Sequence, residues 1–392
     1  MKINTNFSPI LFSLMVLILP LRFIFNGIGN LLLPAKIQYL ALVFIIAIAY
    51  LVKKKNFTIS SNQLLMLFTA IIIYFIIIIN LNDNSDFSIE KSNLLIFSGF
   101  LYIFSPFILI FYKNNYNDEK FTSTMNFFIL ISVFLIISRE ILFSVNYSIL
   151  DLVSTRNFLS LFSSPIEIIN ADNLGVESIP SGRTIGLTLV ACILLSKFSK
   201  YKILIISTVF FFFLIQVGNR QSIIAALLVL FIYSSFKSKF NFLFFILLFS
   251  LVIYSFVDIQ SSRFLDSGGE RSDLIFKFIE NLDKLSFFGN GINSFGEIYY
   301  YPNVYPHNIS IEAIYELGVF FLILLYSLFV INYITFRKTK FKDKSVAEKF
   351  ISLSIVYYLI VAHLSGDMYY NIILISLSLM YNILYMDSKH AY

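Results

Sequence analysis

The chain alternates long apolar segments with short polar connections along nearly its whole length. An apolar segment of about 20 residues is long enough to cross a bilayer as a helix. Twelve such segments are recognisable, and we expect each to be a membrane span. Their approximate bounds are 8–26, 31–52, 63–80, 93–112, 122–143, 183–197, 203–217, 222–236, 240–257, 308–334, 350–365 and 372–386. The pattern predicts an all-α polytopic membrane protein, with residues 1–392 forming a single integral-membrane domain.

Composition supports this class and excludes others. Of the 392 residues, 58% are hydrophobic and 13% are charged. The mean hydropathy is +0.81, which leaves little sequence for a soluble domain. The single cysteine, Cys192, lies inside an apolar segment, so neither an intrachain disulfide nor a cysteine metal cluster is expected. The net charge of +6 is compatible with nucleic-acid binding, but its placement follows membrane topology, so we exclude a nucleic-acid partner.

Lysine is concentrated in alternate connections between the apolar segments. If the N-terminus is cytoplasmic, the connections on that side contain 18 of the 29 basic residues and five of the 23 acidic ones. Short cytoplasmic loops carry such a basic excess, so the pattern predicts that both termini are cytoplasmic. Segments 183–197 and 222–236 have only about 15 apolar residues each, which leaves eleven or thirteen spans as alternatives. An odd number of spans would break the charge pattern.

Arginine has the opposite distribution, since seven of the eight arginines fall outside or at the outer ends of spans. These are Arg22, Arg139, Arg156, Arg183, Arg220, Arg263 and Arg271. The guanidinium group is a planar, permanently charged fork that matches phosphate oxygens. Its enrichment on the side where basic residues are disfavoured indicates an external anionic ligand.

Three of these arginines are candidate anion ligands. Arg220 lies in the short connection 218–222, where Ser222 can cap the next helix and helix amides can assist the guanidinium. Arg271 opens an amphipathic segment, and Arg183 starts the sixth span. The alternative is a structural charge in each case. An outward cation runs against the charge rule, which favours a ligand role for Arg220, whereas both roles stay open for Arg183.

Two predicted external connections are long, at about 144–182 and about 258–307. In the second, the apolar side chains of residues 270–284 recur at helical spacing. This spacing predicts a short amphipathic helix. We expect this helix to lie on the outer membrane face or to cover a cavity.

The densest polar cluster lies where the second long connection enters the tenth span. It reads Tyr305-Pro306-His307-Asn308-Ile309-Ser310-Ile311-Glu312. Of the three histidines, His307 is the one in an external loop, since His363 is inside a late span and the third is in the tail. Asn308 or Ser310 can cap the following helix, whose dipole would favour the neutral imidazole of a general base. An interfacial histidine with a capping or packing role is an equally supported alternative.

Familiar catalytic motifs are absent from the sequence. It has no P-loop, no His-Glu-x-x-His and no Gly-x-Ser-x-Gly, and no Asp-x-Asp or Glu-x-Asp pair in the external segments. We therefore expect no metal site, no other cofactor and no ATP hydrolysis.

Several short motifs together resemble the O-antigen polymerase and O-antigen ligase superfamily of bacterial polysaccharide assembly. They are Gly-Asn-Arg-Gln-Ser at 218–222, the amphipathic segment opened by Arg271, Gly289-x-Gly291-x-x-Ser294-Phe295, and Pro306-His307-Asn308 followed by Glu316-Leu317-Gly318. The similarity covers about residues 218–335, and its most specific element is Pro-His-Asn with the downstream glycine. The first five spans carry no motif of this superfamily.

The resemblance implies a GT-C-like, metal-independent, inverting glycosyltransferase that uses a polyprenyl-diphosphate-linked glycan on the outer membrane face. It implies Arg220 and Arg271 as diphosphate ligands, which Arg183 can join, and His307 as the residue that activates the acceptor hydroxyl. Tyr305, Asn308 and Glu312 are supporting residues. The chemistry agrees, because arginines can stabilise the charge that develops on the diphosphate, and back-face attack needs one base.

Within that superfamily we favour a polymerase over a ligase. The expected partners are an undecaprenyl-diphosphate-linked oligosaccharide, membrane lipid and a chain-length regulator protein, and the expected location is the bacterial cytoplasmic (inner) membrane. The competing class is a lipid-linked glycan flippase or secondary transporter. Such a protein should have matched halves and charged or Gly/Pro-broken helices, and neither is visible in the sequence.

Overall fold

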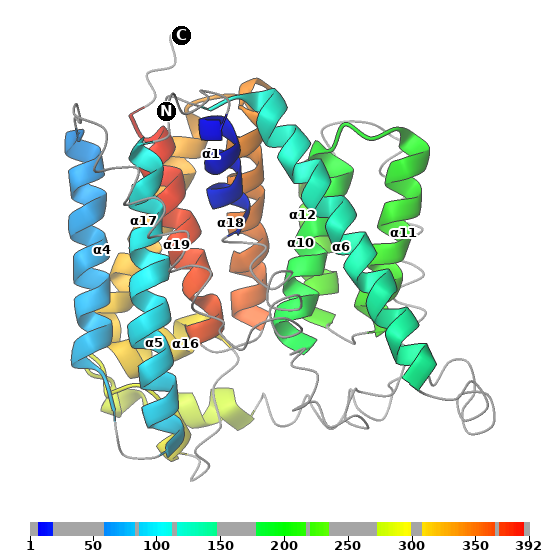
Figure 1. The fold of residues 1–392 in the computed structure, drawn as a ribbon. Coiled ribbons are helices and arrows are strands. Elements are labelled where there is room, and N and C mark those ends of the chain that lie inside the picture. The colour runs from blue at the N-terminus through cyan, green and yellow to red at the C-terminus, as the bar shows by residue number, and fades with distance from the viewer. Residues whose placement is uncertain are drawn as a thin grey trace, which may run out of the picture. The chain divides into compact units, whose positions relative to one another are not determined.

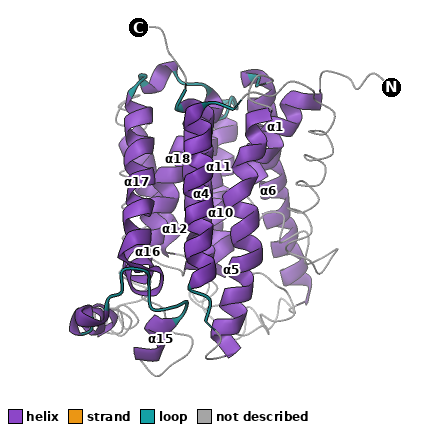
Figure 2. Cartoon of the chain, turned by 90° about the vertical axis from the view of Figure 1, so that its left-hand side faces the viewer, coloured by secondary structure: helices purple, strands orange, loops and turns teal. Residues whose placement is uncertain are grey.

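The computed structural model describes residues 7–18, 59–82, 86–111, 116–146, 178–216, 220–234, 273–298, 308–364 and 368–387. Within these ranges every regular element is helical and no strand occurs (Figure 2), which confirms the all-α class. Contacts divide the chain into two compact units. Unit 1 comprises Met1–Leu19, Ile37–Asp118 and Ser267–Tyr392, and unit 2 comprises Pro20–Lys36 and Glu119–Asp266.

Three helical segments in the described ranges are long and apolar enough to cross a membrane. They are Ser61–Ile79, Ile309–Arg337 and Val346–Leu364. Four shorter apolar helices accompany them, namely Gly99–Ile110, Gly182–Leu195, Gln221–Tyr233 and Asn371–Tyr385. All seven coincide with apolar segments expected from the sequence, so the structure supports a membrane protein. The expected spans 31–52 and 240–257 lie outside the described residues.

Unit 1 is built around α19. Its main helices are α1 (Phe7–Ile18), α4 (Ser61–Ile79), α5 (Asp86–Phe104), α15 (Ser294–Ile298), α16 (Ile309–Glu312), α17 (Gly318–Arg337), α18 (Val346–Leu364) and α19 (Met368–Tyr385). α19 packs against α4, α5, α17 and α18, and lies among them in Figure 1. The helix is mostly apolar and is covered on all sides, since its residues from Asn371 to Leu384 are all buried. On α4, by contrast, Phe68 and Phe75 are exposed, as expected for a helix with a lipid-facing side.

Several chain segments meet at the end of unit 1 where α19 finishes. The contacts that join them are a hydrogen bond from Ser60 to Asp387, one from Lys338 Nζ to the Met386 carbonyl at 2.9 Å, and one from the Val346 amide to Asp118 at 2.8 Å. The lysine-rich connection 338–345 is therefore at the same end as the start of α4 and the end of α19. The predicted topology requires these connections to lie on one side of the membrane, and the observed grouping agrees with that requirement.

The helical run that corresponds to the tenth expected span reverses direction at Gly318. It consists of α16, a π-turn (Ala313–Leu317) and α17. Gly318 has φ +93° and ψ 167°, which are not helical values. Ser310 and Tyr326 are 16 residues apart and centred on Gly318, yet their hydroxyl oxygens are 2.7 Å apart. In a continuous helix they would be about 24 Å apart along the axis, so the run forms a hairpin of a short arm (residues 309–317) and α17.

A loop at 285–292 is hydrogen-bonded to both sides of the hairpin tip. The carbonyls of residues 286–287 accept hydrogen bonds from the amides of 319–320 at 3.3 and 3.1 Å, and the amides of 290–291 donate to the carbonyls of 315–316, both at 3.1 Å. These bonds satisfy the first amides of α17 and the last carbonyls of the π-turn, which a helix interruption leaves without helical partners. Within the expected span 308–334, the chain therefore reverses direction at Gly318, and the loop stabilises this reversal.

The expected amphipathic helix is present over residues 273–280. Leu274 is buried and packs with Phe295 of α15, whereas Phe276 and Ile279 are 62% and 52% exposed. In Figure 1 this yellow-green segment lies across the direction of α4 and the other long helices of unit 1. One apolar face is therefore packed onto unit 1, and a second apolar face is uncovered.

Unit 2 contains four described helices. They are α6 (Asp118–Asn146), whose first residue is assigned to unit 1, α10 (Ser178–Leu195), α11 (Lys200–Gln216) and α12 (Arg220–Ser234). α10 packs against both α11 and α12, and residues 182–192 of α10 are all buried. Since α11 returns between them, α10 and α12 run in the same direction and begin at the same end of unit 2.

Candidate functional site

Asn308 directly precedes the short arm. Its backbone is extended (φ −143°, ψ 117°), and its side-chain oxygen accepts hydrogen bonds from the amides of Ser310 at 2.9 Å and Ile311 at 3.4 Å. Asn308 is therefore the N-cap of α16, which confirms the expected capping role and places Ser310, the alternative cap, inside the helix. The cap fixes the residue at which the short arm starts.

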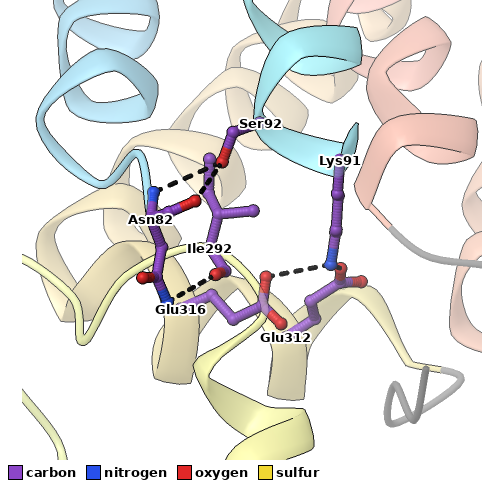
Figure 3. Close-up of polar contacts among 6 residues, drawn as sticks. All are labelled: Asn82, Lys91, Ser92, Ile292, Glu312 and Glu316. Atoms are coloured by element: carbon purple, nitrogen blue, oxygen red, sulfur yellow. Dashed lines mark hydrogen bonds and ion pairs between the residues drawn. The ribbon is translucent and has the colours of Figure 1, made fainter. Parts of the chain in front are cut away.

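Lys91, Glu312 and Glu316 form a buried ionic cluster between α5 and the short arm (Figure 3). The Lys91 Nζ is 2.7 Å from Glu312 Oε1 and 3.0 Å from Glu316 Oε2. The lysine side chain is 3% exposed, and each glutamate side chain is 1% exposed. The two glutamates are four residues apart, so successive turns of the short arm present both carboxylates to the same lysine.

This ionic cluster fastens the short arm to a distant part of the chain. Removing charged groups from water costs several kcal/mol per ion, which only short, well-directed contacts offset. Lys91 makes two such contacts. Its partners Glu312 and Glu316 are separated from it in the sequence by 221 and 225 positions. Loss of the lysine would leave both carboxylates buried without their shared cation.

The ends of α4 and α5 hold the 285–292 loop beside this cluster. The Asn80 side chain donates to the Phe288 carbonyl at 2.7 Å, and the Asn82 side chain donates to the Ile292 carbonyl at 3.2 Å. Ser92 Oγ donates to the Asn82 carbonyl at 3.1 Å (Figure 3). The loop, the hairpin tip, α4 and α5 are thus one hydrogen-bonded assembly.

A second polar group, the hydroxyl–imidazole cluster, consists of Ser310, Tyr326 and His363. His363 lies in the last turn of α18, and its Nδ1 is 2.8 Å from the Leu359 carbonyl. A carbonyl can only accept, so Nδ1 donates this hydrogen bond, and in a ring that carries one hydrogen Nε2 is then an acceptor. Nε2 is 3.0 Å from Ser310 Oγ and 3.1 Å from Tyr326 Oη. This cluster can exchange hydrogen bonds with a polar ligand.

Two of the predicted site residues, Asn308 and Glu312, come together in this part of unit 1. The other three predicted residues of the region, Tyr305, His307 and Arg271, lie outside the described residues. In the sequence, His307 directly precedes the Asn308 cap.

The two remaining predicted residues, Arg183 and Arg220, belong to unit 2. α10 begins at Ser178, so Arg183 lies one turn inside the helix and not at its start, and its side chain is 0% exposed. Arg220 is the first residue of α12, so Ser222 lies within the first turn and is not the cap that the sequence suggested. Because α10 and α12 begin at the same end of unit 2, the structure assigns both arginines to that end.

Sequence reasoning assigned no site role to Lys91, Glu316 or His363, although Glu316 belongs to one of the motifs that resemble the superfamily. In the topology pattern, Lys91 is one of the external charges. Its partners could not be recognised from the sequence, because they are more than 200 positions away. His363 was set aside as a residue inside a span. The available signal was the pair of glutamates four residues apart within an apolar segment, since this spacing puts both carboxylates on one helix face where hydrocarbon would penalise them.

Among the residues that the structure describes, no group of three or more His, Cys, Asp or Glu side chains is arranged to hold a metal ion. A scan of the chain against protein-family models finds no matching family, and a search of curated proteins finds no match. The functional conclusion therefore depends on the residues themselves.

Proposed function

We propose that the protein is a glycosyltransferase of the O-antigen polymerase type that elongates a polyprenyl-diphosphate-linked glycan on the outer face of the bacterial inner membrane. The observation that carries this proposal is the short arm. It is a capped segment that carries Ser310, Glu312 and Glu316 among apolar residues, and its cap, Asn308, directly follows Pro306 and His307 in the sequence. A site of this kind suits a substrate with a polar glycan head and a lipid tail.

The proposed chemistry is a single displacement. The acceptor oxygen attacks the anomeric carbon of the donor from the back face, and His307 takes the proton of the acceptor hydroxyl. The bond from that carbon to the diphosphate oxygen breaks, and its electron pair leaves with the lipid diphosphate. Arg220, Arg271 and Arg183 stabilise the negative charge of this leaving group, so no metal ion is required.

The finer parts of the proposal follow the same resemblance. They are a GT-C-like arrangement of about twelve spans, cytoplasmic termini, an undecaprenyl-diphosphate-linked oligosaccharide as substrate, and a chain-length regulator protein as partner. A ligase that moves the finished glycan to a lipid A core would use the same donor and the same leaving group. The two activities differ in the acceptor.

Reconstitution tests the proposal directly. The protein is placed in vesicles with undecaprenyl-diphosphate repeat units in the presence of EDTA, and the products are separated by size. We expect a ladder of multiples of the repeat unit. Repeat units that stay single under these conditions would contradict the polymerase proposal, and transfer only to an added lipid A core would identify a ligase.

A lipid-linked glycan flippase or secondary transporter is the second candidate, and one structural feature favours it. The reversal at Gly318 is a broken helix and the Lys91 cluster is a buried charge group, and transporters typically have both features within the membrane. The same vesicles distinguish the two functions. Movement of repeat units between leaflets, without formation of longer glycans, would support the transporter.

A further inference from the structure

The hydroxyl–imidazole cluster has fewer protons than short contacts. With Nδ1 of His363 donating to Leu359, a ring that carries one hydrogen has one acceptor site, at Nε2. The hydroxyls of Ser310 and Tyr326 supply two protons, whereas the three polar atoms make three contacts of 2.7, 3.0 and 3.1 Å. One hydroxyl therefore donates to Nε2, the second donates to the first, and the third contact carries no proton.

This order leaves the second hydroxyl as the open end of a hydrogen-bonded chain. The O–H of this second hydroxyl donates into the cluster, and its oxygen accepts no hydrogen bond from the cluster. That oxygen can therefore accept a hydrogen bond from an incoming O–H group. Each donor in such a chain polarises the next one, which strengthens the bond to the incoming group. The cluster is thus suited to a ligand that donates through a hydroxyl.

The surroundings of the cluster indicate which ligand this is. Tyr326 is 41% exposed, while Ser310 and His363 are half-buried, so the cluster can be reached from the tyrosine side. Its neighbours on the exposed face of α17, Ile323 and Val330, are apolar and 53% and 56% exposed, so the cluster lies beside a surface like the lipid-facing side of α4. An accessible aromatic ring beside a hydroxyl and an imidazole is the chemistry that binds a sugar, because the ring packs on C–H groups while polar atoms bind hydroxyls.

We infer that Ser310, Tyr326 and His363 form a subsite that binds a hydroxyl group of the acceptor glycan. The inference rests on the proposed glycosyl transfer and adds a site to it. Ser310 is three residues after His307 in the sequence. The subsite holds the acceptor sugar through hydrogen bonds, and the proton transfer is left to His307.

The test measures binding of a defined probe, the repeat-unit oligosaccharide released by mild acid from the lipid-linked material of cells that lack the protein. Its dissociation constant is measured by calorimetry on the full chain in nanodiscs. Ser310→Ala and Tyr326→Phe each remove one hydroxyl, so each should raise the dissociation constant about fivefold to tenfold. Ser310→Thr keeps the hydroxyl and should bind nearly as well as the unchanged protein.

Two hydroxyls elsewhere on α17 provide matched controls. Ser327 Oγ bonds to the Ile323 carbonyl of its own helix, and the Tyr333 hydroxyl is near Arg337. Ser327→Ala and Tyr333→Phe should leave the dissociation constant unchanged. Thermal unfolding of every variant, followed by circular dichroism, checks that the fold is retained.

The outcomes separate the subsite from the proposed function. Equal binding by the unchanged protein, Ser310→Ala and Tyr326→Phe would overturn the subsite even if vesicles make polymer, and so would an absence of oligosaccharide binding. Equal weakening by the two controls would also overturn it. Binding that depends on Ser310 and Tyr326, in a protein that makes no polymer, would uphold the subsite and reject glycosyl transfer.

Discussion

Gly289 and Gly318 touch backbone to backbone at the tip of the hairpin. Both have positive φ angles, +102° and +93°. A Cβ atom on Gly318 would lie 2.4 Å from the Gly289 nitrogen, and one on Gly289 would lie 2.4 Å from the Glu316 carbonyl oxygen. Because these neighbours are backbone atoms, no side-chain rotation can relieve the overlap. The reversal therefore requires glycine on both of the crossing segments.

Gly291 provides a matched comparison for Gly289, since both have φ +102°. A Cβ on Gly291 would meet its nearest neighbour, in Asn82, at an ordinary 3.6 Å. Gly291→Ala should lose roughly 1–3 kcal/mol of stability from the strained φ alone. Gly289→Ala should lose about 1–3 kcal/mol more, because the overlap adds to that strain. Thermal unfolding in detergent measures both, and equal losses would mean that the close crossing is not important for stability.

The Lys91 cluster makes a prediction about buried charge. Lys91→Met should cost about 3–5 kcal/mol, because it leaves two buried carboxylates without their shared cation. Adding Glu312→Gln and Glu316→Gln should recover most of that loss, since no charge then remains in the cluster. Lys202→Met, at an exposed lysine of α11, is the control and should have little effect. A triple variant as unstable as Lys91→Met would show that the destabilisation is not electrostatic.

The uncovered apolar face of helix 273–280 should lie in the outer leaflet of the bilayer. The chain has no tryptophan, so a single introduced tryptophan reports on its own surroundings. Ile279→Trp should be quenched by lipids with brominated acyl chains, and Lys277→Trp, about 160° away around the helix, should be quenched far less. Equal quenching at both positions would place this helix away from the membrane surface.

Substitution of Arg220 distinguishes a diphosphate ligand from a charge that only sets membrane topology. If its guanidinium binds the diphosphate through forked hydrogen bonds, Arg220→Lys should lower glycan transfer about a hundredfold although the charge is kept. Arg337→Lys, at the far end of α17, should have no such effect. Near-normal polymer from Arg220→Lys would indicate that the residue only orients the chain.

His307→Gln tests the proton acceptor. A glutamine can keep a capping or packing hydrogen bond but cannot act as a base, so transfer should fall by about 10²–10⁴-fold. Binding of the lipid-linked donor should persist, because the arginines hold the diphosphate. His390→Gln, in the C-terminal tail, serves as the control. Full-length polysaccharide from His307→Gln would reject the base assignment.

The positions of helices could be predicted from the sequence, because a long apolar segment indicates residues that are buried in lipid or in the protein core. The start of α16 was predictable for a local reason, since an asparagine that caps a helix acts on amides two and three residues away. Each of these features is determined within a short window of sequence.

The reversal at Gly318 could not be predicted in this way. Apolar residues continue on both sides of the glycine, and a glycine inside an apolar segment is compatible with a continuous helix. What stabilises the reversal is the 285–292 loop, whose hydrogen bonds come from residues about 30 positions away. The partners of Lys91 could not be predicted for the same reason, because they are more than 200 positions away. A lysine near the end of a span is first interpreted as a charge that sets membrane topology.

In the sequence, residues Glu119–Asp266 of unit 2 separate two parts of unit 1. Unit 1 can therefore be completed only after unit 2 has been synthesised. Lys91 emerges from the ribosome 221 residues before Glu312. At a synthesis rate of about 5–20 residues per second, the lysine waits on the order of 10–40 seconds for its first carboxylate. If α5 enters the membrane during that time, Lys91 is there without the carboxylates of Glu312 and Glu316. Lys91 lies in the second turn of α5, close enough to the helix end for its long side chain to reach the water interface. The location of the lysine near the helix end therefore lets α5 insert early and lets the buried cluster form late.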